Sequence, residues 1–211
     1  IYSLCKTGTI DGIESSTLSL SLLFSMIFMG IYLWKAKYIS KEKTTWSPVS
    51  GIYLLLTVAI CFASIVVLDY ILSFMDWLPN ILETTFSTLQ AGWLGIFCIA
   101  ILGPILEELL FRGAITKALL QEYNPTKAIV ISALVFGIIH INPIQVVSAT
   151  LIGFLLAWVY YKTASLIPCI IIHIINNTLS VYLSLQYSEV ETIRELFTGS
   201  TYYIIIGGAI V

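Results

Sequence analysis

Seven apolar stretches alternate with short polar segments along this chain of 211 residues. A helix needs about 20 mainly apolar residues to cross the hydrocarbon core of a bilayer, and most of the stretches approach that length. They lie near residues 18–34, 51–75, 89–118, 126–141, 144–162, 166–186 and 201–211. The pattern predicts an all-α, polytopic bundle of transmembrane helices, with six spans and the start of a seventh.

The ends of the sequence lead us to expect a longer protein. The first residue is Ile1 rather than Met, and the last residue, Val211, lies inside an apolar stretch. We therefore expect residues to be missing at both ends, and a full-length chain to have up to eight spans.

Composition supports the membrane assignment. The chain is 58% hydrophobic and 10% charged, whereas a typical soluble domain has roughly 25% charged residues. Lipid must therefore cover most of the surface. The net charge is -2, and no basic stripe could follow a phosphate backbone. We expect the lipid bilayer as a partner and no nucleic acid.

Lysines gather in alternate loops, which predicts an orientation. Loops rich in Lys and Arg stay in the cytoplasm. The first loop, residues 35–46, holds four lysines, whereas the alternate loops are acidic apart from Arg194. We therefore expect a multi-pass protein of the cell membrane, with the start of this chain outside and the 35–46 loop in the cytoplasm.

Three charged residues lie in the third apolar stretch. Each charge at mid-membrane costs about 3 kcal/mol on insertion scales, so Glu107, Glu108 and Arg112 need compensation. Arg112 follows Glu108 by four residues, which places both on one helical face where they can pair. Glu107 is rotated by about 100° and stays free for chemistry. Alternatively, the charges lie at the inner end of the helix and extend to water.

Both histidines of the chain also lie in apolar stretches. His140 follows Phe136 by four residues, and His173 precedes Asn177 by four, so each pair shares a helical face. The helical rise places Glu107, His140 and His173 roughly 15, 20 and 12 Å from the inner surface, within mutual reach if the helices tilt. A membrane histidine can also be a simple interhelical hydrogen-bond donor.

Two prolines disturb the helices that carry these residues. Pro104, one turn before Glu107, should kink its helix and leave a backbone carbonyl unpaired. Lipid tolerates such a carbonyl only beside a cavity or a protein partner, so we expect a cavity beside Glu107. Pro143 follows His140 closely. We expect either a steeply tilted helix there or a turn of the chain inside the bundle.

A carboxylate and two imidazoles supply the groups needed to hydrolyse an amide with water: a base, an acid and donors for the oxyanion. The same residues, Glu107, His140 and His173, can also bind a divalent metal such as zinc with an open fourth position. The H-E-x-x-H signature of many zinc proteases is absent from the sequence. Metal-assisted and metal-free hydrolysis both stay open.

Three short motifs occur in order across these stretches. The chain reads E-E-x-x-x-R at Glu107–Arg112, F-x-x-x-H at Phe136–His140 and H-x-x-x-N at His173–Asn177. This set resembles the CAAX protease and bacteriocin-processing (CPBP) family, also called Abi. The resemblance covers about residues 90–185 and implies a catalytic core of four helices.

The resemblance also implies roles and a division of the chain. Glu107 would activate the attacking water with help from His140, while His173 and Asn177 would hold the oxyanion. The supporting residues that order the site would be Glu108, Arg112 and Phe136. The three parts would be N-terminal helices with the basic loop at 1–88, the core at 89–186, and an outer loop with the start of a last helix at 187–211.

Family members include enzymes that trim the last three residues from prenylated CAAX proteins and bacterial relatives linked to peptide maturation and bacteriocin immunity. They were first classed as metalloproteases, and a glutamate mechanism without a required metal was favoured later. The resemblance implies an intramembrane endopeptidase that hydrolyses membrane-associated proteins or peptides.

Two other functions fit parts of the pattern. A non-enzymatic immunity or scaffold protein could keep the same fold and bind a peptide without turnover. An ion-coupled transporter could use buried glutamate and histidine residues as a proton relay. Transporters of that kind often contain inverted repeats, and this sequence shows no internal repeat.

Overall fold

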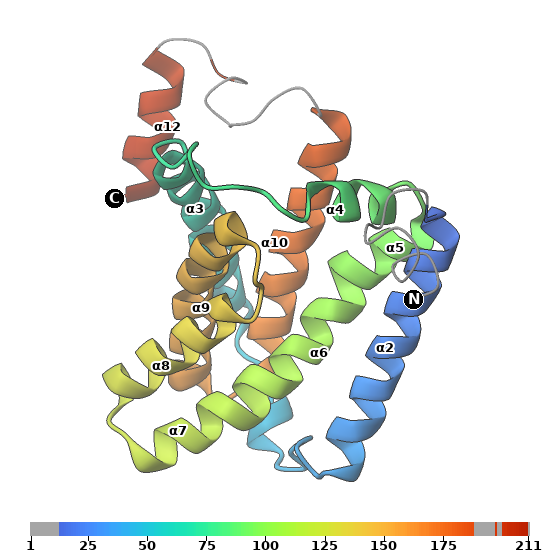
Figure 1. Ribbon diagram of the computed structural model, residues 1–211. Coiled ribbons are helices and arrows are strands. Elements are labelled where there is room, and N and C mark those ends of the chain that lie inside the picture. The colour runs from blue at the N-terminus through green and yellow to red at the C-terminus, as the bar shows by residue number, and fades with distance from the viewer. Residues whose placement is uncertain (1–12, 188–196, 198–199, 211) are drawn as a thin grey trace.

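Helices occupy every apolar stretch of the sequence in the computed structural model, which describes residues 13–187, 197 and 200–210 (Figure 1). Within these residues, five helices or helical runs are long and apolar enough to cross a membrane: α2 (Ser15–Lys35), α3 (Gly51–Leu72), the run Trp93–Glu122, α9 (Pro143–Thr163) and α10 (Leu166–Gln186). Two shorter helices are α8 (Pro125–Ile138) and α12 (Ser200–Ile210), and the described part contains no strand. The predicted all-α, polytopic bundle is confirmed.

The third span is one helical run in which two wider, π-type segments interrupt the α-helix. Its parts are α5 (Trp93–Phe97), η2 (Cys98–Leu102), α6 (Gly103–Leu110), η3 (Phe111–Thr116) and α7 (Lys117–Glu122). At the end of η2, the Gly103 N–H donates to the Cys98 carbonyl, five residues back. π-type turns occur frequently at functional sites, and α6, which lies between the two, carries Glu107 and Glu108.

The fourth apolar stretch ends earlier than its sequence suggests. α8 has 14 residues, or about 21 Å, and is shorter than a bilayer core of about 30 Å. The chain turns at residues 139–142 before α9 begins, and Asn142 in this turn is fully buried. The expectation that the helix reaches residue 141 is therefore wrong. The chain turns here, as one of the two alternatives for this region predicts, and Asn142 is the buried residue of the turn.

Small residues let α8 and α9 pack closely as a hairpin. A Cβ added to Gly137 would lie 1.8 Å from the Thr150 Oγ1 and 2.7 Å from the Val146 carbonyl oxygen. A Cβ on Gly153 would lie 3.1 Å from the Phe136 ring. Only glycine leaves room for this approach, which brings the Phe136 ring against the backbone of α9.

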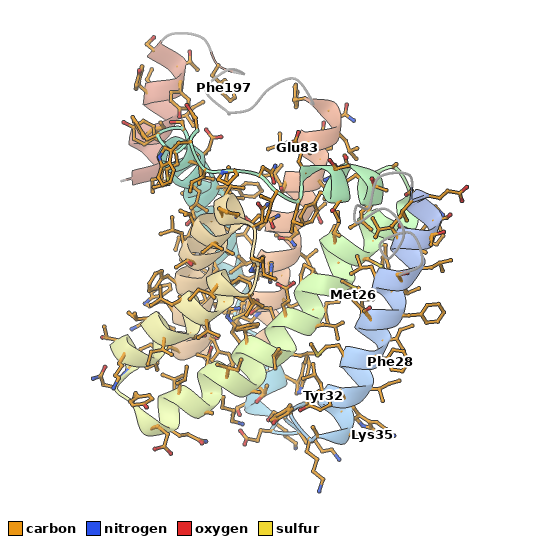
Figure 2. All side chains as sticks on the ribbon, in the orientation of Figure 1. Met26, Phe28, Tyr32, Lys35, Glu83 and Phe197 are labelled. Carbon is orange, nitrogen blue, oxygen red and sulfur yellow. The ribbon has the colours of Figure 1, made fainter. Side chains whose placement is uncertain are left out.

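The surface and the interior of the bundle differ as expected for a protein in lipid. Fully buried apolar residues of α9 and α10 form the centre: Leu156, Val159, Leu166, Cys169 and Ile172. Large apolar side chains of α2 and α3 are instead 57–75% exposed: Phe24, Phe28, Ile52 and Leu55. Figure 2 shows Phe28 projecting outward from α2. The exposed apolar surface and the long apolar helices together indicate a multi-pass membrane protein.

Short segments connect the spans. A 3-10 turn, η1 (Thr44–Trp46), lies in the predicted cytoplasmic loop, and α4 (Glu83–Gln90) precedes the third span. The truncated ends predicted at Ile1 and Val211, and the acidic loop with Arg194, fall outside the described residues. The division into residues 1–88, 89–186 and 187–211 stays a prediction.

Candidate active site

Glu108 and Arg112 form the ion pair that their spacing predicts. The Arg112 Nη1 donates to the Glu108 Oε1 at 3.0 Å, and both side chains are fully buried. The Arg112 Nη2 donates to the Gly153 carbonyl of α9 at 3.1 Å. Its guanidinium also lies over the Phe136 ring, 4.5 Å from the centroid. Arg112 therefore joins the third span to the α8–α9 hairpin, and the charges do not extend to water.

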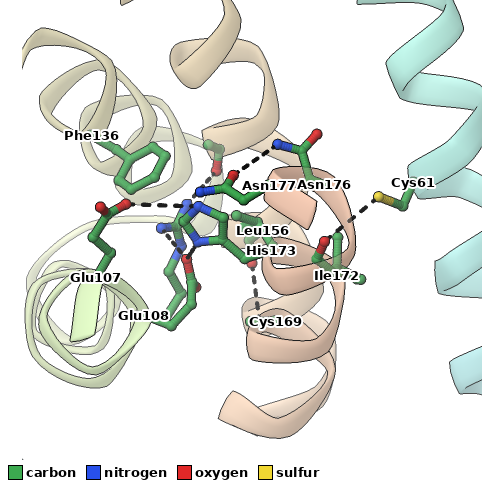
Figure 3. Close-up of polar contacts among 12 residues, drawn as sticks. Cys61, Glu107, Glu108, Phe136, Leu156, Cys169, Ile172, His173, Asn176 and Asn177 are labelled. Atoms are coloured by element: carbon green, nitrogen blue, oxygen red, sulfur yellow. Dashed lines mark hydrogen bonds and ion pairs between the residues drawn. The ribbon is translucent and has the colours of Figure 1, made fainter. Parts of the chain in front are cut away.

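The same carboxylate oxygen holds His173 (Figure 3). The His173 Nδ1 lies 2.8 Å from the Glu108 Oε1. Because a carboxylate paired with a guanidinium accepts hydrogen bonds, Nδ1 carries the proton and the ring is held in one orientation. His173 projects from α10 and is 3% exposed. Glu108 thus fixes the orientation of the His173 imidazole, whose other nitrogen, Nε2, does not contact Glu108.

That second nitrogen faces Glu107. The His173 Nε2 lies 3.7 Å from the Glu107 Oε2, a distance too long for a direct hydrogen bond. Among the described residues, the Glu107 Oε2 is buried and has no hydrogen-bond partner, while the side chain as a whole is 33% exposed. One water can bond both atoms at such a separation. Glu107 is therefore the free carboxylate that the sequence predicts.

His140 lies in the turn after α8, two residues beyond Ile138, the last residue of that helix. The His140 Nδ1 lies 2.7 Å from the Phe136 carbonyl oxygen. The Phe136 ring contacts both imidazoles edge-on, with centroid distances of 5.0 Å to His140 and 5.7 Å to His173. Phe136 therefore connects the two histidines.

Asn177 binds the η2 segment of the third span. Its Nδ2 donates to the Ile99 carbonyl at 3.0 Å, and its Oδ1 accepts a hydrogen bond from the Asn176 Nδ2 at 3.2 Å. In the five-residue pattern of η2, residue 104 would bond the Ile99 carbonyl, but Pro104 has no N–H. The carbonyl that the sequence predicts to be unpaired is thus satisfied by a protein partner.

Sequence reasoning missed the backbone groups of the site. The carbonyls of Gly153 and Ile99 accept hydrogen bonds from Arg112 and Asn177. Pro104 pointed to a free carbonyl in η2 but not to its partner. Nothing in the sequence indicated the contact made by the Gly153 carbonyl.

The three residues considered for a zinc site from the sequence, Glu107, His140 and His173, are only partly brought together. In the described part of the chain, no three His, Cys, Asp or Glu residues gather closely enough to hold a metal ion. The His173 Nε2 faces Glu107, and the Nδ1 atoms of His173 and His140 are bonded to Glu108 and the Phe136 carbonyl, which leaves Nε2 of each ring as the nitrogen available to a ligand. A divalent metal bound by Glu107, His140 and His173 stays a prediction.

Comparison with known proteins gives two matches to this region. Residues 88–179, which include every candidate site residue, match the family described as "Type II CAAX prenyl endopeptidase Rce1-like". A segment of 104 residues is 35% identical to "Putative membrane peptidase YdiL" of Bacillus subtilis (strain 168). This match covers 49% of the chain and 43% of the relative, so the chain spans less than half of the relative's length. No solved structure matches the chain.

Proposed function

Because residues 88–179 match the Rce1-like CAAX endopeptidase family, we propose that the protein is an intramembrane endopeptidase of the CAAX-protease (CPBP) family. Its substrates would be membrane-associated proteins or peptides. The observation that carries the proposal is the unpartnered Glu107 Oε2, which lies 3.7 Å from the Nε2 of an imidazole that Glu108 holds in place.

In the proposed reaction, a water held between Glu107 and His173 attacks the carbonyl carbon of the peptide bond. The Glu107 carboxylate takes one proton from the water as the new C–O bond forms, and the carbonyl oxygen becomes an oxyanion. Glu107 then gives this proton to the amide nitrogen, and the C–N bond breaks. The products are a carboxyl group and an amine, and Glu107 returns to its starting state.

Donors for the oxyanion would come from α10 and the turn after α8. Asn177 has a second amide hydrogen besides the one used by the Ile99 carbonyl, and this hydrogen can reach a substrate oxygen. His173 would share the role, while His140 would help to orient the attacking water. These roles follow the family resemblance, and the fixed orientation of His173 supports them.

The orientation of the protein in the membrane is part of the proposal. The lysine distribution places the 35–46 loop in the cytoplasm. This loop is held against α7 by the Glu42–Lys117 ion pair at 2.8 Å, so the two segments lie on the same side. The substitutions Lys41→Cys and Trp77→Cys, each made alone in a chain without reactive native cysteines, would test this orientation. An impermeant thiol reagent added outside intact cells should label only Cys at position 77, and the reverse labelling would contradict the orientation.

The activity test compares peptide ends in cells that carry the parent, Glu107→Gln or Glu122→Gln. Glu122 is exposed at the end of α7 and serves as the matched carboxylate control. Peptide ends present with the parent and Glu122→Gln should be absent with Glu107→Gln. If all three chains give the same ends, the endopeptidase proposal fails. Retained cellular function in Glu107→Gln would instead support the non-enzymatic immunity or scaffold alternative.

The metal question has its own test. Because Glu107, His140 and His173 are not gathered as a three-ligand set, we expect cleavage to survive exhaustive chelation. Activity should be measured before and after chelation, with elemental analysis of the purified protein. Loss of activity on chelation, with recovery on adding zinc, would contradict this expectation.

A further inference from the structure

The turn that carries His140 contains a strained residue. The Asn142 N–H donates to the His140 carbonyl at 2.6 Å, and Ile141 between them has a φ of 62°. A hydrogen bond between residues i and i+2 around a positive φ is a rare and strained turn. A β-branched residue in this conformation is a genuine outlier. Such strain persists only where surrounding contacts hold the backbone in place.

Asn142 supplies these contacts. It is fully buried, its Oδ1 accepts a hydrogen bond from the Ile81 N–H at 3.0 Å, and its Nδ2 donates to the Asn80 Oδ1 at 2.8 Å. Its carbonyl accepts from the Val146 N–H in the first turn of α9 at 2.8 Å. One residue therefore joins the His140 turn to α9 and to the segment between α3 and α4.

The position of the His140 ring depends on this turn. The ring Nδ1 bonds the Phe136 carbonyl at 2.7 Å, and the His140 N–H bonds the Gly137 carbonyl at 3.0 Å. A carbonyl only accepts hydrogen bonds, so Nδ1 carries a proton, and in the neutral imidazole Nε2 keeps its lone pair. A shift of the backbone at residues 140–142 would break this alignment and change the tautomer.

We propose that Asn142 and Asn80 are positioning residues for His140. Their amide pair fastens the strained turn to the α3–α4 segment and so fixes the orientation of the His140 imidazole. The catalytic consequence rests on the proposed function, whereas the effect on the imidazole does not.

The first experiment observes the ring directly. The chain has only two histidines, so 15N-histidine labelling of the detergent-solubilised, untagged protein gives two sets of ring signals, and a His173→Gln sample assigns them. The parent should show His140 with its proton on Nδ1. Asn142→Ala should lose this preference, and Asn80→Ala, at an exposed position, should weaken it. Unchanged His140 signals in both variants would overturn the proposal.

The second experiment measures cleavage. Asn142→Ala should lower kcat about 10- to 100-fold with KM close to that of the parent, because a misplacement of about 1 Å can cost that much. In a His140→Ala background, the same substitution should cause little further loss, since Asn142 acts through His140. Equal losses in both backgrounds would indicate a general structural defect and contradict the proposal. Gln121→Ala, at an exposed amide on α7, is the matched control.

A rescue variant tests the strain itself. Glycine adopts positive φ without cost, so Ile141→Gly should restore part of the kcat lost in Asn142→Ala. No recovery would contradict the role of the strained turn. A parent that cleaves nothing, while its His140 signals still respond to Asn142→Ala, would refute the proposed function and leave the positioning role supported.

Discussion

Two adjacent glutamates on α6 have opposite surroundings. Glu108 is fully buried, and its Oε1 is bonded to both Arg112 and His173. Glu107 is one-third exposed, and its buried oxygen has no hydrogen bond within the described residues. We call Glu108, Arg112 and Asn177, whose side chains are hydrogen-bonded within the protein, the framework of the site. We call the partly exposed Glu107 its open edge.

This comparison suggests how a bilayer-embedded site can be both rigid and reactive. A buried charge must be paired, and here the pairing is arranged so that it also orients His173. The carboxylate left without a partner is then the group with capacity for a proton. Substitutions in the framework should reduce stability first, whereas substitutions at the open edge should reduce activity alone.

The largest effect on stability is expected at Arg112. Arg112→Met keeps a long side chain but leaves the Glu108 carboxylate buried without its cation, which should cost about 3–5 kcal/mol. Unfolding in detergent would measure it, with Lys127→Met, at an exposed cation, as the control. Equal stability of the two variants would mean that the ion pair is not part of the framework.

A smaller loss of stability is expected when Asn177 is substituted. Asn177→Ala leaves the Ile99 carbonyl without its donor, which should cost about 1–3 kcal/mol. Pro104→Ala restores a backbone N–H at the start of α6 that can bond this carbonyl. In the Pro104→Ala background, Asn177→Ala should therefore destabilise less. If its cost is the same in both backgrounds, the carbonyl of Ile99 is not what Asn177 stabilises.

Much of the framework follows from helical periodicity alone. The four-residue spacing predicts the Glu108–Arg112 pair, and the rotation between neighbours predicts that Glu107 is free, because both relations lie within one helix. Contacts between elements are different. The bonds of Asn177 to Ile99 and of Arg112 to Gly153 depend on how helices pack, which no local spacing encodes.

The turn at residues 139–142 shows the same limit. The sequence offers apolar residues up to Ile141, and hydropathy extends the helix through them. Asn142 ends this region because it bonds a segment about sixty residues earlier, near Asn80. Pro143 indicated a break, but the position of the turn is decided by that tertiary contact.

The smallest loss of stability is expected when the exposed ion pair between Glu42 and Lys117 is broken. Glu42 and Lys117 lie 2.8 Å apart, with side chains 62% and 27% exposed. Glu42→Gln should cost less than about 1 kcal/mol, and the difference should shrink further at high salt. Unfolding at low and high salt would measure it. A loss as large as that of Arg112→Met would break the distinction between buried and exposed pairs.

The most direct test exchanges each glutamate of α6 for glutamine and measures cleavage and stability on the same purified samples, with a substrate identified from the peptide ends. Glu107→Gln should lower the cleavage rate by at least about 100-fold, the usual scale of a general base, and keep the unfolding temperature of the parent. Glu108→Gln should lower the unfolding temperature. Cleavage by Glu107→Gln at the parent's rate would contradict the account.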